Sequence, residues 1–243
     1  MEIMGVKKMY SDFTKSIEPK SNSFCVSVSG PLAMFGTPTS KQNCEMISYP
    51  MPTYSALCGM MNHIYYRPGM KWVIEKCRVM KEIKYQEITI KTPHYREKSL
   101  AKSRKIQILN YSFLLDVEYQ IKAHYVIDKA FVNDEHGNCA FVHDDAIRNA
   151  IENGTEKMVK LGKSNSGIAM VRPCEWGERK SFYDNHGTSE AIWMFHSFKF
   201  DKKDWDRVIT DVGFCKQYMD KGIIDFENIR VTYQSKNKGR HSL

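Results

Sequence analysis

A long stretch of alternating apolar and polar residues most constrains how this chain folds. It runs from Phe113 to Ile127. Alternate positions carry apolar side chains: Leu115, Val117, Tyr119, Ile121, Ala123, Tyr125 and Ile127. The positions between them carry Asp116, Glu118, Gln120, Lys122 and His124. Because successive side chains of a strand point to opposite faces, the stretch predicts one long strand with one face against an apolar core.

Shorter patterns predict the elements around this strand. Strands are expected at 24–28, 72–80, 85–90, 191–200, 223–226 and 229–233. A helix is expected between Thr53, a good N-cap, and the stop Arg67-Pro68-Gly69. Its apolar face would consist of Ala56, Leu57, Met60, Met61 and Ile64. A second helix is expected at 144–153, with Ile147, Ala150 and Ile151 facing inward.

The order strand–helix–strand–strand–helix–strand favours an α+β fold of the ferredoxin-like, RNA-recognition type. We expect a flexible N-terminal extension over residues 1–22 and the ferredoxin-like domain over 23–160. A β-rich C-terminal extension with a basic tail would occupy residues 161–243. At 243 residues the chain is long enough to bury a core without covalent staples.

Several classes of protein are disfavoured by composition. No apolar window is long enough for a transmembrane helix, and the charged N-terminus does not resemble a signal peptide, so we expect a cytoplasmic protein without a membrane partner. The seven cysteines are scattered and form no Cys-x-x-Cys pair. This argues against a disulfide scaffold or a structural zinc site, and we expect neither a metal nor another cofactor.

The distribution of charge favours a nucleic-acid partner. The chain carries 36 Lys and Arg against 28 Asp and Glu, a formal net charge of +8. The segment KTPHYREKSLAKSRK, residues 91–105, holds six basic residues and one glutamate, and so more than half of this excess. Such a loop between strands suits RNA phosphates. The expected RNA-binding residues are Lys41, Lys91, Arg96, Lys98, Lys102, Arg104, Lys105, Lys122 and His124.

Two further motifs have alternative interpretations. Residues 162–167, GKSNSG, have glycines at P-loop spacing, but Ile168 follows where a P-loop needs lysine, which leaves a loop that could admit an RNA backbone. His143-Asp144-Asp145 lacks the further ligands of a metal site. The two aspartates would suit the first turn of a helix. His143 could serve as a general acid or base, although spacing alone does not select it over His124.

An ordered set of segments resembles a known family, the CRISPR-associated Cas5 proteins of type I-C (Dvulg) systems, which belong to the RAMP superfamily. The segments are SYPMPTYSALCG at 48–59, IYYRP at 64–68, RVMK at 78–81, DVEYQIKAHY at 116–125, PCEWG at 173–177, FYD at 182–184 and MFHSF at 194–198. The resemblance covers about residues 24–226. It implies a ferredoxin-like RNA-binding domain that cleaves precursor CRISPR RNA at the repeat hairpin without metal and leaves a 2′,3′-cyclic phosphate. It also implies that the protein stays on the 5′ handle, beside the backbone and large subunits of a type I surveillance complex that meets target DNA.

The family's catalytic set is a tyrosine, a lysine and a histidine. The resemblance places the tyrosine at Tyr65 and the histidine at His143, whereas the lysine falls on Val142. An arginine-rich stretch of the family is replaced here by NGTEK, residues 153–157. A cation could come instead from Lys122, Arg148 or a lysine of the 91–105 loop. The alternative function is a non-catalytic subunit that holds the guide RNA while another nuclease cuts.

Overall fold

The computed structural model describes residues 17–36, 45–93, 106–128, 140–155, 157–163, 165–200 and 209–235. The helices are α2 (Tyr54–Ile64) and α3 (Ala140–Asn153). The first strands are β1 (Ile17–Lys20), β2 (Phe24–Ala33), β3 (Glu45–Ile47), β4 (Met70–Val79), β5 (Lys84–Pro93) and β6 (Ile106–Asp128). The later strands are β7 (Met170–Pro173), β8 (Ile192–Phe200), β9 (Ile209–Gln217), β10 (Ile223–Asp225) and β11 (Val231–Ser235).

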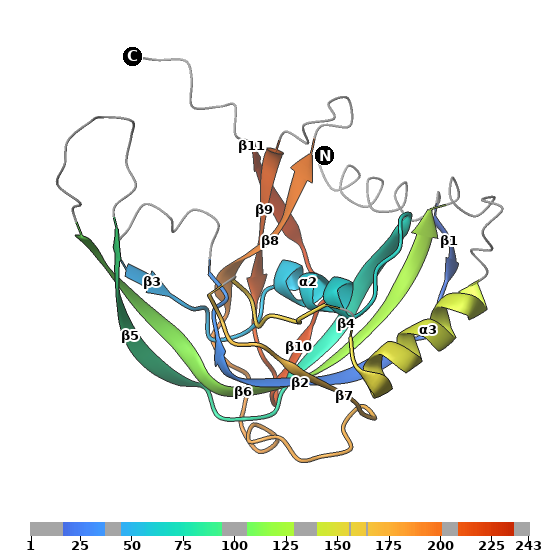
Figure 1. Ribbon diagram of the computed structural model, residues 1–243, viewed down its shortest axis with the longest axis horizontal. Coiled ribbons are helices and arrows are strands. Elements are labelled where there is room, and N and C mark those ends of the chain that lie inside the picture. The colour runs from blue at the N-terminus through green and yellow to red at the C-terminus, as the bar shows by residue number, and fades with distance from the viewer. Residues whose placement is uncertain are drawn as a thin grey trace.

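The larger sheet has ferredoxin-like topology. Its main path is β10-β4-β6-β2-β7, with β6 antiparallel to both β2 and β4. In chain order, α2 joins β2 to β4 and α3 joins β6 to β7, which confirms the expected βαββαβ arrangement. Figure 1 shows both helices on the same side of the curved sheet. The predicted central strand is therefore the one around which the domain is built.

The strand that closes the ferredoxin-like sheet is not among those that the sequence predicts. It is β7, which pairs with β2 and lies beyond the boundary expected at residue 160. Its four residues are exposed or half-buried, so no alternation of apolar residues marks them. Within the expected N-terminal extension, Ile17–Lys20 forms β1 and pairs with the end of β6.

The basic segment connects two paired strands. β5 pairs with the first half of β6 up to Pro93 and Ile106, so residues 94–105 join the two strands of a hairpin and lie outside the described residues. At Asp116 the backbone takes a positive φ of 48°, at the point where β6 passes from pairing with β5 to pairing with β4. The predicted loop is thus shorter than expected, and its first residues extend β5.

The helix that carries Tyr65 at its end forms as its sequence predicts. The Thr53 hydroxyl accepts a hydrogen bond from the Ala56 amide at 3.2 Å and caps α2. Leu57, Met60, Met61 and Ile64 are all buried on its inner face. That face packs on the sheet together with Ile147 and Ile151 of α3. Burial of such side chains, at about 1.5–3 kcal/mol each, holds the helices against the sheet.

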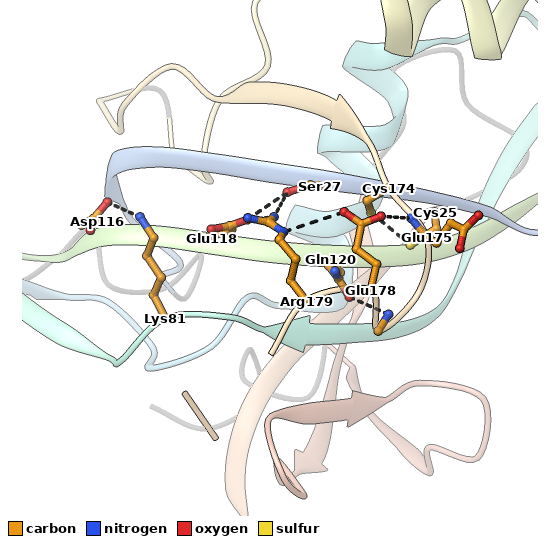
Figure 2. Close-up of polar contacts among 11 residues, drawn as sticks. Cys25, Ser27, Lys81, Asp116, Glu118, Gln120, Cys174, Glu175, Glu178 and Arg179 are labelled. Carbon is orange, nitrogen blue, oxygen red and sulfur yellow. Dashed lines mark hydrogen bonds and ion pairs between the residues drawn. The ribbon is translucent and has the colours of Figure 1, made fainter. Parts of the chain in front are cut away.

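The polar face of β6 is not open to solvent. Figure 2 shows the segment after β7 crossing β2 and β6, where the Arg179 guanidinium bonds Glu118 and the Gly177 amide donates to Gln120 Oε1 at 3.0 Å. Gln120 is fully buried as a result. The Cys174 sulfur lies 3.3 Å from that of Cys25 on β2. The polar face of this part of the strand is therefore covered by a later segment of the chain.

The C-terminal part of the chain forms a second sheet, in the order β11-β9-β8. It packs on α2 through the His196 ring, which stacks on Tyr54 at a centroid distance of 4.3 Å. The strand predicted at 191–200 belongs to this sheet, whereas the one predicted at 223–226 is β10 at the edge of the larger sheet. In the described ranges, no helix is both long and apolar enough to cross a membrane.

Candidate active site

The end of helix α2 sets the position of Tyr65. Tyr65 is the C-cap, with extended backbone (φ −155°, ψ 132°), and its amide donates to Met61 at 3.0 Å. The Trp72 indole Nε1 on β4 donates to the Tyr65 carbonyl at 2.9 Å. The backbone of Tyr65 is therefore held from both the helix and the sheet, and its ring leaves the helix in a defined direction.

His143 reaches Tyr65 from helix α3. Its Nδ1 lies 2.8 Å from the Tyr65 hydroxyl oxygen, and the two rings meet at 61° with centroids 5.8 Å apart. His143 is only 6% exposed. The two residues that the resemblance singled out are thus in direct contact, although they come from different helices.

The surroundings of His143 favour its neutral form. Burial lowers the pKa of His143 and the positive charge of Arg67 lowers it further, while Asp144 acts in the opposite direction. A neutral imidazole with its proton on Nε2 can accept a hydrogen bond from the Tyr65 hydroxyl at Nδ1. The pair then consists of a hydroxyl donor and an acceptor that is ready to take a proton.

Arg67 brings a positive charge to the same place. Its guanidinium carbon lies 4.8 Å from the centroid of the Tyr65 ring, and its Nη1 donates to the Tyr66 carbonyl at 3.0 Å. The turn that follows α2 holds its backbone, because the Arg67 carbonyl accepts from the Met70 amide at 3.1 Å. In the sequence, Arg67 is recognisable only as part of the helix stop Arg67-Pro68-Gly69, and no local signal marks it as a site residue.

Tyr125 on β6 and Asp144 on α3 lie next to the Tyr65–His143 pair. The buried Tyr125 hydroxyl donates to Asp144 Oδ1 at 2.6 Å, and its ring lies 6.0 Å from that of His143. Burial and this hydrogen bond both raise the pKa of Tyr125, so it stays protonated. Because α3 begins at Ala140, Asp144 is not in the first turn, and the helix-dipole interpretation of Asp144 is wrong. It ties α3 to β6 instead.

Lys122 and His124 lie on the face of β6 opposite to Tyr125. His124 Nδ1 is 2.7 Å from Glu75 Oε1, and Lys122 Nζ is 3.6 Å from Glu75 Oε2. Burial lowers the pKa of His124 in spite of this partner. The sheet separates this cluster from His143, so neither residue brings a charge to the Tyr65–His143 pair.

The remaining expected RNA-binding residues fall in two groups. Lys91 is exposed on β5 near the tip of the hairpin. The others lie outside the described residues: Lys41, Arg96, Lys98, Lys102, Arg104 and Lys105. Their role in binding RNA stays a prediction.

Packing alone accounts for the glycines of the 162–167 loop. Gly162 has a φ of +104°, and a Cβ there would meet the Met34 carbonyl oxygen at 2.1 Å. A Cβ on Gly167 would lie 2.9 Å from the Leu32 carbonyl oxygen. Both glycines let the loop pack directly against the end of β2.

The fold and the site together define an RNA-recognition-type ferredoxin domain with a Tyr–His pair between its two helices. Residues 24–227 match the family described as CRISPR-associated protein (Cas5), in its Cas5d group, and the chain belongs to this family.

Similar proteins agree with this assignment. A protein of Mannheimia succiniciproducens named CRISPR pre-crRNA endoribonuclease Cas5d is 26% identical over 152 residues, 60% of this chain and 64% of that protein. The match therefore spans somewhat less than two thirds of the length of that relative. A crystal structure of a CRISPR-associated protein has a TM-score of 0.67 at 25% identity, covering 86% of this chain and 93% of that one. A functionally uncharacterized protein from Streptococcus mutans has the same fold, with a TM-score of 0.66 at 23% identity, covering 87% and 98%.

Proposed function

We propose that this chain is an endoribonuclease that cuts precursor CRISPR RNA at its repeat hairpin without a metal ion and then holds the 5′ handle of the guide. Membership of the Cas5 family and the name of the Mannheimia relative support the substrate class. The observation that carries the cleavage step is the 2.8 Å contact between the Tyr65 hydroxyl and His143 Nδ1. Such a pair can move protons at a ribose hydroxyl without a metal-bound water.

The cleavage step is a transesterification in which all atoms come from the RNA. The ribose 2′-hydroxyl gives its proton to the Tyr65 oxygen while the Tyr65 proton passes to Nδ1 of neutral His143. The 2′ oxygen then bonds to phosphorus, and the bond from phosphorus to the 5′ oxygen breaks. The proton held by His143 returns through Tyr65 or a water to the departing 5′ oxygen. The products are a 2′,3′-cyclic phosphate and a 5′-hydroxyl, and both side chains regain their starting states.

RNA holding rests on charge rather than on the Tyr–His pair. The net charge of +8 and the basic segment 91–105 suit the phosphates of the handle. In this role the chain would sit beside the backbone and large subunits of a type I-C-like surveillance complex and would meet target DNA only through that complex. The function needs no cofactor.

A second candidate is a guide-RNA subunit without cleavage activity. The sequence itself favours it at one point, because Val142 stands where the resembled family has a lysine, immediately before His143. Binding of the handle is common to both functions. Cleavage therefore separates them.

The deciding experiment incubates the purified protein with its own labelled repeat RNA in EDTA. We expect one specific cut, which disappears in His143→Ala and is strongly reduced in Tyr65→Phe. A homologous type I-C protein cutting its own repeat serves as the control for the conditions. The absence of a cut by this chain in that parallel assay would exclude the endoribonuclease. Cleavage that persists when Tyr65→Phe and His143→Ala are combined in one protein would exclude these two residues as the active site.

A further inference from the structure

The Tyr65–His143 pair lacks one component that cleavage requires. When the 2′ oxygen attacks, negative charge builds on the non-bridging oxygens of the phosphate, and a fixed positive donor lowers the energy of that state. The pair moves protons, but in its resting, neutral form it holds no fixed positive charge. The sequence left open Lys122, Arg148 and the lysines of the 91–105 loop as sources.

Two of these sources are occupied elsewhere in the structure. Lys122 pairs with Glu75 on the opposite face of β6 from Tyr125. The Arg148 guanidinium lies over the Phe24 ring, 5.8 Å from its centroid. Lys122 is thus paired on the far face of the sheet, and the contact found for Arg148 is with Phe24.

Arg67 has the position, the charge and the donors for this role. Its guanidinium lies 4.8 Å from the Tyr65 ring, and its positive charge acts on His143 as well. Arg67 is exposed, and none of the ion pairs found among the described residues involves it. A guanidinium has five N–H donors in a planar fork, of which the contact with the Tyr66 carbonyl uses one.

The backbone of Arg67 is also held, as a preorganised donor requires. The residue sits between the C-cap of α2 and the start of β4, and its carbonyl accepts from the Met70 amide. Gly69 completes this turn with a φ of 81°. The charge therefore stands beside the pair before substrate arrives, so that little reorganisation is needed during the reaction.

We propose that Arg67 is the catalytic cation of this site, with its guanidinium donating to the non-bridging oxygens of the scissile phosphate next to the Tyr65 hydroxyl. The assignment rests on the proposed cleavage function. In this assignment the chain carries its catalytic charge at the end of α2, whereas the family resemblance places that charge at Val142, beside His143 on α3.

Single-turnover cleavage in EDTA, with RNA affinity measured separately, tests the assignment. Arg67→Ala should slow cleavage about 100-fold, the usual effect of removing one donor to a developing anion, while the affinity for repeat RNA changes little. Arg67→Lys should restore part of the rate because it keeps the charge but loses the fork. Arg148→Ala is the matched control, because Arg148 is also an exposed arginine on the same side of the sheet. This variant should cut at the wild-type rate. An unchanged rate in Arg67→Ala, or a loss explained wholly by weaker binding, would overturn the assignment and leave the cleavage function intact.

An NMR titration of the His143 ring in the free protein separates catalysis from a structural role. The groups around this ring are Tyr65, Arg67, Tyr125 and Asp144. Loss of the Arg67 charge should raise the pKa of His143 in Arg67→Ala but not in Arg148→Ala. If cleavage fell with no change in this pKa and with a lower melting temperature, Arg67 would be structural and the assignment wrong. If the wild-type protein cut no RNA at all, the proposed function itself would fail, and the assignment with it.

Discussion

The hydroxyl of Tyr65 lies 2.8 Å from Nδ1 of His143, although 78 positions separate the two residues in the chain. They approach because α2 and α3 lie on the same side of the sheet, α2 ending at Tyr65 and α3 carrying His143 near its start. The contact is between side chains of neighbouring helices, so it depends on the whole ferredoxin-like arrangement.

The first prediction concerns the pH dependence of cleavage. In the proposed mechanism the neutral imidazole of His143 accepts the proton, and burial lowers the pKa of His143 below its usual value of about 6.5. The single-turnover rate in EDTA should therefore fall as pH drops through that lowered pKa and be level above it. Any residual rate in His143→Ala should not show this dependence on pH. A rate that increased on acidification below about pH 6.5 would contradict a neutral base.

The second prediction concerns the basic segment 91–105. Replacing Lys98, Lys102 and Arg104 together by alanine should weaken binding of single-stranded handle RNA. It should also reduce the slope of log affinity against log salt by about 2, because each phosphate contact contributes about 0.7 for single strands. Replacing Lys122 alone should change the slope less, since Glu75 already offsets its charge. An unchanged slope in the triple variant would show that this segment does not contact phosphates.

The third prediction concerns the buried carboxylate of Glu75. It is 5% exposed and is held by Ser23, His124 and Lys122. Glu75→Ala leaves these groups without their acceptor and should lower the free energy of unfolding by about 3 kcal/mol. The exposed pair Glu82–Lys84 provides the control, because solvent screens this pair and Glu82→Ala should cost much less. Urea unfolding measures both, and equal losses would contradict a structural role for the Glu75 cluster.

The fourth prediction concerns His196, which joins the second sheet to α2. Burial lowers the pKa of His196 to about 4. In the unfolded chain His196 becomes protonated near pH 6.5, whereas in the folded chain it becomes protonated only near pH 4. The free energy of unfolding therefore keeps its full value above about pH 6.5. It decreases as pH falls towards 4, by up to about 3 kcal/mol.

His196→Phe provides the comparison for this prediction, because it keeps a ring against Tyr54 and has no titrating group. Urea unfolding at several pH values should show a steeper loss of stability in the wild type than in the variant. Parallel losses would mean that His196 is not responsible.

Local patterns predicted much of the framework because they reflect one physical demand, the burial of apolar side chains. The alternation at 113–127 identified a real core face, on which Tyr119, Ile121 and Tyr125 are almost fully buried. The same pattern could not show what covers the polar face. There the partners, Arg179 and the Gly177 amide, come from a segment far along the chain. β7 was missed for a related reason, since an edge strand with exposed side chains leaves no period in the sequence.

The candidate site was predictable in its residue types and not in its geometry. The family resemblance named Tyr65 and His143, and the helix stop Arg67-Pro68-Gly69 was visible from proline and glycine alone. That stop also brings a guanidinium to the Tyr65 ring, which no local signal indicated. Asp144 was assigned to a helix dipole because the start of α3 was placed too late.

By itself, the sequence determined the long central strand, the capped helix before Tyr65, the fold class and the excess of positive charge, since each depends on neighbouring residues and their hydrophobic period. The tertiary structure alone decided which charges act together. It placed Lys122 and His124 with Glu75 behind the sheet and put Arg67 beside the Tyr65–His143 pair. The physical reason is that electrostatic coupling depends on distance and burial in space, and strand pairing and helix packing set both.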